Sequence, residues 1–356
     1  MSGFAAGFRN RSPLVLAAAV LLTVPVFLLL QAFFASGAWS DIPLHYWLRH
    51  PHDDPGVVSW SVGRLKQNPP SARAVYLVGG SSAREGIVSG ASLAHDVRRL
   101  GGPTIVAANM ASSLQTFSQS LAIADNVPAD DAWIVIGVNP GRFASDKDVS
   151  LEQAVGKGML LKSDYLNRYV AATYDRYRFD PTILPGIFTY LSDLARVYVR
   201  GLNSGKWSAG RYERHRVDDK PPRSVERKQR FVKAWYRVRY PAFEQNLAMN
   251  VDMLDRLVAR SRERGLHVVL VELPINIDIV GDQFDRPEAQ YRPQVRRLAR
   301  KYGVPYLDFN DELAIPDAYF YDLQHLTKTG RPIWQKRLAQ ELVDLMRKAD
   351  AGQGQQ

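Results

Sequence analysis

Short apolar runs rich in β-favouring residues recur along the chain, and each is stopped by a polar or turn-forming residue. The runs are Val75–Val78, Thr104–Ala108, Trp133–Val138, His267–Leu273 and Val304–Phe309. Continuous runs of this length are typical of strands buried on both faces. Amphipathic stretches lie between them and are expected to be helices. We therefore predict an α/β fold, a parallel sheet flanked by helices.

The clearest predicted helix is Asn246–Arg264, because its apolar residues return at helical spacing on one face. They are Leu247, Val251, Leu254, Leu257 and Val258. A stripe of this kind faces a sheet or a neighbouring helix in a folded domain.

A longer apolar segment, Leu14–Ala35, precedes all of these runs. A helix over it would be about 33 Å long, enough to cross the hydrocarbon core of a bilayer. Arg9 and Arg11 precede the segment and the first charge after it is Asp41. The positive-inside rule then leaves residues 1–13 in the cytoplasm and the rest of the chain outside. We expect an uncleaved single-pass anchor; the alternatives are a cleaved signal peptide and a buried core helix.

Residues 36–73 form a connector rich in aromatic and titratable side chains. It holds Trp39, Trp47, Trp60, His45, His50, His52, Asp53 and Asp54. Tryptophans just beyond a span often lie at the lipid headgroups. Histidines beside carboxylates raise the question of a metal site, but their spacing matches no common ligand pattern. We expect a solvated loop and no metal.

Residues 150–240 interrupt the strand–helix alternation with a long, aromatic and basic stretch. Between Arg200 and Arg239 there are 13 Lys or Arg against four Asp or Glu, a net charge of +9 out of +10 for the whole chain. Arg211–Arg223 has the composition of a flexible loop. We interpret the stretch as a helical insertion on the rim of the sheet that acts as a lid or docking surface, or else as a solvated insert with surplus charge.

The positive charge favours an anionic membrane surface or an acidic polymer as partner. Arg227, Lys228 and Arg230 are the residues that we expect to bind such a partner. Nucleic acid is not expected, since the predicted topology puts this surface outside the cytoplasm.

Composition limits the chemistry. A chain of 356 residues holds one large domain with additions, or two domains, and its apolar fraction of 46% suits a folded protein. There is no cysteine, which excludes disulfides, thiolate catalysis and cysteine-ligated zinc or iron–sulfur sites. We expect no cofactor.

Two distant stretches carry residues suited to acyl transfer. The strand Val75–Val78 ends in Gly79-Gly80, followed by Ser81 and Ser82. A serine on a glycine turn at the carboxyl end of a strand lies where open α/β sheets place their sites. Either serine fits, and we favour Ser81 because it follows the two glycines directly.

Far down the chain, Asp322 and His325 lie three residues apart and share a face on a helical turn. A serine nucleophile needs a base, a group that orients the base, and donors for the oxyanion. Histidine supplies a base that works near neutral pH. Asn139 and Asn109 each end a strand, and the Asn139 amide is a candidate oxyanion donor.

These blocks resemble the SGNH (GDSL-like) hydrolase superfamily. Gly79-Gly80-Ser81 resembles its first block, Gly137-Val138-Asn139 its third and Asp322-Leu323-Gln324-His325 its last. The resemblance implies a Ser81 nucleophile, a triad completed by Asp322 and His325, and an oxyanion donor at Asn139. It covers roughly Ala74–Asn139 and His267–Leu342.

Two positions depart from the family pattern. Asn109–Thr116 resembles the second block, but Leu114 stands where the family has its oxyanion glycine, so only its backbone N–H is available as a donor. Pro140 follows Asn139 where many members have Asp. We expect the substrate to be bound by Gly80, Ser82, Arg84, Asn109 and Leu114.

The anchor, the Gly-Gly-Ser-Ser-Ala-Arg-Glu turn and Glu272-Leu273-Pro274 are together similar to anchored SGNH proteins of bacterial surface-polymer acylation, such as the DltD-like and alginate-acetylation proteins. Those proteins work beside a multi-spanning membrane O-acyltransferase. The similarity implies an inner-membrane protein with a periplasmic or otherwise extracytoplasmic catalytic domain, an acyltransferase or esterase acting on a surface polysaccharide. A lipase or thioesterase acting on membrane lipids and a non-catalytic scaffold are the alternatives.

The chain then divides into five further parts after the cytoplasmic N-terminus. They are the anchor (14–35), the connector (36–73), an SGNH-like catalytic domain in two pieces (74–149 and 241–346), the basic insertion (150–240) and a disordered tail (347–356).

Overall fold

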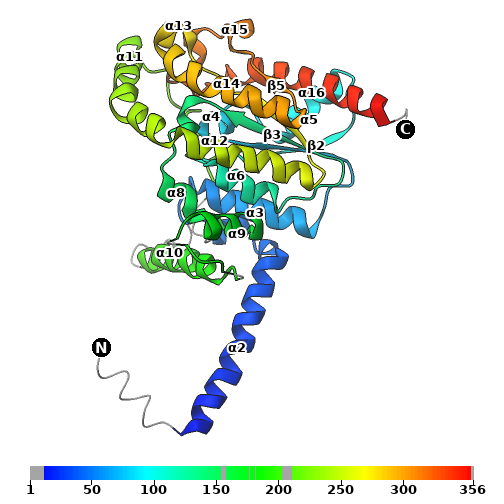
Figure 1. Ribbon diagram of the computed structural model, residues 1–356, viewed down its shortest axis with the longest axis vertical. Coiled ribbons are helices and arrows are strands. Elements are labelled where there is room, and N and C mark those ends of the chain that lie inside the picture. The colour runs from blue at the N-terminus through cyan, green and yellow to red at the C-terminus, as the bar shows by residue number, and fades with distance from the viewer. Residues whose placement is uncertain (1–11, 154–157, 176, 181, 203–210, 354–356) are drawn as a thin grey trace.

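The computed structural model describes residues 12–353 apart from 154–157, 176, 181 and 203–210. Its centre is a five-stranded sheet in the order β2-β1-β3-β4-β5, with every pairing parallel. The strands are β1 (Arg73–Val78), β2 (Ile105–Asn109), β3 (Ala132–Val138), β4 (His267–Glu272) and β5 (Tyr306–Leu307). The predicted α/β fold with a helix-flanked parallel sheet is confirmed (Figure 1).

Both faces of the sheet are covered, as the continuous apolar runs require. In β1, Tyr76 and Val78 face one hydrophobic core, while Val75 and Leu77 face the other, because successive side chains of a strand alternate sides. The first core is closed by α3 (Asp54–Gln67), α6 (Phe117–Ala124), α12 (Tyr240–Glu263) and α14 (Asp285–Tyr302). The second is closed by α5 (Gly90–Arg99) and α16 (Arg331–Gln353).

The end of α16 corrects one prediction. Residues 347–353 were expected to be disordered, but α16 continues to Gln353. Buried Met346 packs into the core just before this segment, Arg347 donates to the carbonyl of Gly101 (3.1 Å), and Asp350 pairs with Arg73 (2.8 Å). These contacts keep the last turns folded onto the domain.

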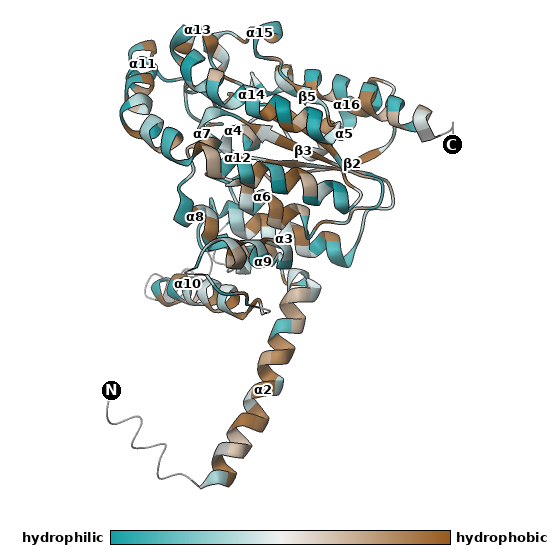
Figure 2. Cartoon of the chain, in the orientation of Figure 1, coloured by the Kyte–Doolittle hydropathy of each residue, from teal (hydrophilic) through white to brown (hydrophobic). Residues whose placement is uncertain are grey.

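A single apolar helix, α2 (Pro13–Ser36), extends away from the body (Figures 1 and 2). Ser12 caps its first turn, and it ends at Gly37 in the left-handed conformation. The helix is long and apolar enough to cross a membrane, and its most apolar window is buried by no other part of the described chain. Arg9 and Arg11 lie outside the described residues.

The connector is folded, which corrects the prediction of a solvated loop with tryptophans at the headgroups. Trp39 and Trp47 are buried in a small core with Phe34 and with residues of α10 (Leu184–Leu202), Tyr190 among them. Removing a large aromatic ring from water is favourable, so tryptophans are buried where another apolar surface can cover them.

Asp53 and Asp54 are buried as well. Asp53 caps α3 and binds Arg49 (2.7 Å), and Asp54 pairs with Arg84. Within the part of the chain that the structure describes, no group of His, Asp and Glu has an arrangement that would hold a metal ion.

The insertion is helical, as expected. At its C-terminal end, however, the helix continues without interruption into the sheet domain. It contains α8 (Lys147–Glu152), α9 (Asp164–Thr173), α10, α11 (Val225–Ala234) and the π-helical turn η4 (Trp235–Arg239). The backbone stays helical from α11 through η4 into α12. The insertion therefore joins a core helix of the sheet domain directly.

Candidate active site

The turn after β1 presents two serines at the carboxyl edge of the sheet. Gly79 makes the turn, and a Cβ there would lie 2.7 Å from the Cβ of Ala83, so only glycine lets the short helix α4 (Ser81–Arg84) begin at once. β1 and β3 are neighbours in the sheet. The residues that follow these two strands therefore meet at one edge.

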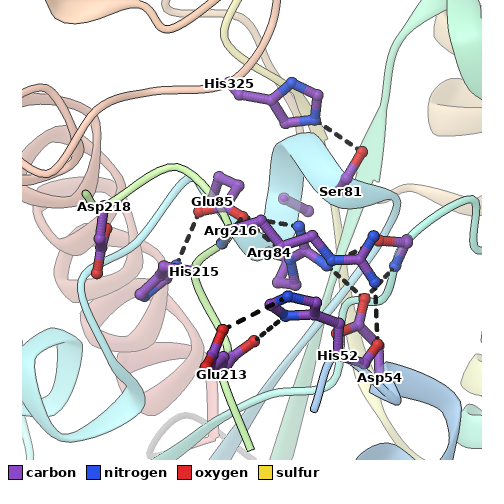
Figure 3. Close-up of polar contacts among 12 residues, drawn as sticks. His52, Asp54, Ser81, Arg84, Glu85, Glu213, His215, Arg216, Asp218 and His325 are labelled. Carbon is purple, nitrogen blue, oxygen red and sulfur yellow. Dashed lines mark hydrogen bonds and ion pairs between the residues drawn. The ribbon is translucent and has the colours of Figure 1, made fainter. Parts of the chain in front are cut away.

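Ser81, His325 and Asp322 form a hydrogen-bonded chain. The His325 Nε2 atom lies 2.8 Å from Ser81 Oγ, and Figure 3 shows the ring directed at this serine. The Nδ1 atom of the same ring lies 2.8 and 2.9 Å from the two carboxylate oxygens of Asp322. The structure thus brings together three residues that lie 244 positions apart in sequence at the widest.

Asp322 is held in its ionised form. Its carboxylate also accepts the backbone N–H groups of Gln324 and His325, both at 3.1 Å. Burial alone would raise the pKa of Asp322, but attraction to the His325 ring and these hydrogen bonds lower it below its ordinary value. An ionised Asp322 keeps a proton on Nδ1 and leaves Nε2 free to accept the proton of Ser81.

Ser82 has different partners from Ser81. Its hydroxyl lies 3.3 Å from Asn139 Nδ2 and 3.4 Å from Gln324 Oε1. Asn139 ends β3 and caps α7 (Pro140–Phe143) by accepting the N–H of Arg142 (3.1 Å), while its amide also donates to Gln324 (3.3 Å). Of the two serines, Ser81 is the one that is hydrogen-bonded to His325. Its role as nucleophile stays a prediction.

A cavity of about 340 Å³ opens in front of these groups. Its lining includes Gly80, Ser81, Ser82, Leu114, Asn139, Arg142, Trp235, Arg239, Gln324 and His325. A second hollow of about 470 Å³ lies against α11 and η4, with Phe231, Ala234 and Val238 on its wall. Trp235, Arg239, Gln324 and His325 border both, so the insertion forms one wall of the site.

Leu114 adopts a glycine-like backbone. Its φ is 55°, in the left-handed region, and its side chain is 69% exposed at the mouth of the cavity. A leucine there costs about 1 kcal/mol relative to an ordinary conformation. Among the described residues no group accepts a hydrogen bond from its N–H, although Ser113 and Gln115 on either side do donate theirs.

Arg84 and Asn109, expected to bind substrate, do not line the cavity. Arg84 is 3% exposed and binds Asp54, Glu85 and the hydroxyl of Ser113 (2.7 Å). The Asn109 amide donates to the carbonyl of Arg84 (3.2 Å). Both residues hold the loops that follow β1 and β2, so the prediction is corrected to a structural role.

No protein-family model matches the sequence, and no curated protein matches it significantly. The interpretation of the site therefore depends on its geometry.

A buried polar network lies behind the turn that carries Ser81. Glu85 is fully buried and accepts from Arg84 (2.7 Å) and His215 (2.9 Å) (Figure 3). It also accepts from Arg331 (2.8 Å). Burial would raise the pKa of Glu85, but the hydrogen bond with His215 and the charges of Arg84, His215 and Arg331 lower it to about 2.

The same network corrects the prediction that Arg211–Arg223 is a flexible loop. His215 bonds to Glu85, and the Tyr212 hydroxyl donates to Asp54 (2.9 Å). A segment tied to two buried carboxylates is fixed in place.

Arg142, Gln324, Trp235 and Arg239 line the cavity and were missed by sequence reasoning. Gln324 lies between Asp322 and His325 in the same turn, and that adjacency was its available signal. Trp235 and Arg239 sit on the insertion, where nothing in the sequence indicated that they face the cavity.

Proposed function

We propose that the protein is an SGNH-type serine acyltransferase or esterase. The observation that carries the proposal is the chain from Ser81 Oγ to His325 Nε2 (2.8 Å) and from His325 Nδ1 to the Asp322 carboxylate (2.8 Å). A serine within reach of an oriented imidazole is the arrangement that nucleophilic acyl transfer requires.

In the proposed reaction Ser81 Oγ attacks the carbonyl carbon of an ester while its proton passes to His325 Nε2. Collapse of the tetrahedral intermediate breaks the bond to the leaving alcohol, which takes the proton from His325 and leaves an acyl group on Ser81. A hydroxyl of the acceptor, or water, then gives its proton to His325 and attacks the acyl carbon. The second tetrahedral intermediate collapses, and His325 returns the proton to Ser81 Oγ as the product leaves. Asp322 stabilises the imidazolium in both steps.

Asn139 and Leu114 both line the cavity, and in the proposed reaction the Asn139 amide and the Leu114 backbone N–H donate to the developing oxyanion. The left-handed φ of Leu114 is the conformation that a glycine would adopt there. Gln324 Oε1 accepts from Asn139 at 3.3 Å, and a substrate carbonyl oxygen would take over that hydrogen bond. Two such donors contribute about 10²- to 10³-fold each in enzymes of this kind.

We further propose that α2 anchors the protein in a bacterial inner membrane, with the catalytic domain outside the cytoplasm, and that the acceptor is an acidic surface polysaccharide. Support comes from the apolar length of α2 and from the exposed basic residues of α11 and η4, of which Arg239 borders the cavity. These are Arg227, Arg230, Lys233, Arg237 and Arg239. The resemblance to surface-polymer acylation proteins suggests a membrane O-acyltransferase as partner.

A lipase or thioesterase is the second candidate. The observation that favours it is the hollow lined by Phe231, Ala234 and Val238 beside His325, which has the apolar character that a long acyl chain needs.

The matched variants Ser81→Ala and Ser82→Ala test the proposal, using full-length protein in detergent, a small chromogenic ester and a serine-directed phosphonate. Ser81→Ala should lose turnover by at least about 10³-fold and take up no phosphonate. Ser82→Ala should still be labelled on Ser81. An adduct mapped to Ser82 would reassign the nucleophile, and equal turnover of Ser81→Ala and wild type would leave the non-catalytic scaffold as the better interpretation.

A further inference from the structure

The helix α10 lies against the apolar helix α2 rather than on the sheet domain alone. Figure 1 shows it crossing beside the upper end of α2, beneath the body. The Phe188 ring of α10 meets the Phe27 ring of α2 edge-on, with centroids 5.8 Å apart. Leu30 and Phe34, one and two turns later in α2, pack in the same small core as Ile187 and Tyr190 of α10.

This contact fixes the depth of α10 along α2. Phe27 lies nine residues before Ser36, the last residue of α2, which places it about 13 Å from that end of the helix. If α2 crosses a bilayer from Pro13, a hydrocarbon core about 30 Å thick takes up about 20 of its residues and ends about one turn before Ser36. Phe188 is then level with lipid rather than with water.

The residues of α10 suit such a position because the helix is apolar on two sides. Ile187, Tyr190 and Leu194 are buried against the connector. On the opposite side Phe188 and Val199 are 47% and 60% exposed. A soluble helix normally shows water a polar face.

The remaining exposed positions are small or basic. They are Pro185, Thr189, Ser192, Ala195, Arg196 and Arg200. Arginines at the edge of an apolar face reach the headgroups of anionic lipids, although Arg196 also pairs with Asp193 (3.0 Å).

We propose that α10 is a membrane-interface helix whose outer face, Phe188 and Val199, is embedded in the lipid of the leaflet from which α2 emerges. The proposal rests on the membrane anchoring by α2 proposed above, and it adds a second attachment point. The occupant of the exposed face is lipid, because that face is continuous with the lipid-facing side of α2 through the contact between Phe188 and Phe27.

The absence of cysteine from the chain makes a direct test available. Single cysteines at Val20 in α2, at Val199 in α10 and at Lys348 in α16 carry a fluorophore in the full-length protein. Each protein is incorporated into nanodiscs of phosphatidylethanolamine and phosphatidylglycerol, where both faces are open to water. Iodide quenches labels in water, and a nitroxide-labelled lipid quenches labels in the hydrocarbon.

Iodide quenching at Val199 should be at least about fivefold weaker than at Lys348, because the anion does not enter hydrocarbon. The nitroxide lipid should quench Val199 and Val20 but not Lys348. Iodide quenching of Val199 equal to that of Lys348, with Val20 protected, would overturn the role of α10 and leave the anchor standing. Exposure of Val20 as well would remove the anchor, and the proposal for α10 with it.

Discussion

Ser81 and Ser82 are adjacent and chemically identical, yet their hydroxyls meet different partners. Successive residues of a helix point about 100° apart, so at the start of α4 one hydroxyl faces His325 and the next faces Asn139 and Gln324. The reactivity of each serine is thus set by its position on the turn.

The base and the orienting residue should be distinguishable by substitution. His325→Ala should abolish esterase or acyl-transfer activity, and Asp322→Asn should cost the same or less, because it removes orientation and charge support but leaves the base. Turnover is measured with a small ester, and thermal unfolding confirms that both variants fold.

His267→Ala is the control for loss of a histidine. Its ring stacks on Trp133 at 4.6 Å, away from the cavity, so turnover should be retained. Wild-type turnover in folded His325→Ala would rule out both enzymatic proposals.

Glu272 is a buried carboxyl that the proposed mechanism does not use. It ends β4, accepts hydrogen bonds from Tyr291 (2.9 Å) and Tyr306, and is fully buried. Burial raises the pKa of Glu272 to about 8, although these hydrogen bonds and the charge of Arg292 act in the opposite direction.

Glu272→Gln should therefore stabilise the protein at high pH. An unfolded glutamate ionises near pH 4.5, so between about pH 4.5 and 8 the folded state holds a proton that the unfolded state has lost, and the free energy of unfolding falls as pH rises. The variant escapes this loss and should gain on the order of 4 kcal/mol near pH 8 and little near pH 4.5. Denaturant unfolding at both pH values measures it.

The surface variant Glu263→Gln controls for removal of one negative charge, since that side chain is 54% exposed. A gain for Glu272→Gln that is equal at both pH values would contradict the raised pKa.

At the level of elements, the continuous helical run α11–η4–α12 borders the cavity at η4 and packs in the core under the sheet at α12. α12 contributes Leu254, Leu257 and Val258 to the core under the sheet. Trp235, at the start of the π turn, packs on Phe284 with ring centroids 4.9 Å apart and borders both hollows. π turns inside helices are common at functional sites, and this one turns an aromatic side chain toward the cavity.

The basic face of α11 should recognise an anionic polymer. Lys228, one of the residues expected to do so, is instead 1% exposed and bonded to Asp317, so it has a structural role. Replacing Arg227, Arg230 and Lys233 together with Gln should weaken binding of an acidic polysaccharide and spare hydrolysis of a small ester. Binding by wild type should also weaken with salt, since the Debye length falls to about 3 Å at 1 M.

A matched triple variant on α14, with Gln at Arg296, Arg297 and Arg300, removes equal charge from exposed positions away from the cavity. If both triple variants lost binding equally, the effect would come from the net charge of the protein and not from the α11 face. Unchanged affinity in the α11 variant would leave that face as solvated surface.

The strands were predictable because their apolar runs are local signals: β1, β3 and β4 begin and end within two residues of the predicted runs. The connector was not, because its partners are remote. Trp47 accepts a hydrogen bond at its carbonyl from Tyr190, 143 residues away, and no periodicity in either segment encodes that meeting. Short local motifs made Gly79, Ser81, Asp322 and His325 predictable. Trp235 was not predictable, because it borders the cavity only through the way in which the insertion folds.

At the scale of the whole molecule, the body and α2 have opposite surface chemistry. Figure 2 shows α2 predominantly hydrophobic beside a body whose helices alternate polar and apolar faces. The net charge of +10 belongs largely to the body's insertion, whose basic helix α11 lies at the end of the body far from α2 (Figure 1).

The proposed topology predicts the side of the membrane on which the C-terminus lies. A reporter active only outside the cytoplasm, fused after Gln356, should be active, and one active only in the cytoplasm should be silent. Exchanging Arg9 and Arg11 for Glu should reduce this asymmetry. Strong cytoplasmic-type activity in the unaltered fusion would exclude the proposed location.

The buried Glu85 has a consequence for the order in which the chain folds. It binds His215, 130 residues later, and Arg331, 246 residues later, and contacts so distant form slowly. A chain made from its N-terminus onward finishes its first three strands long before Arg331 exists. The turn that carries Ser81 therefore stays without its support, and without His325, until nearly the last tenth of synthesis.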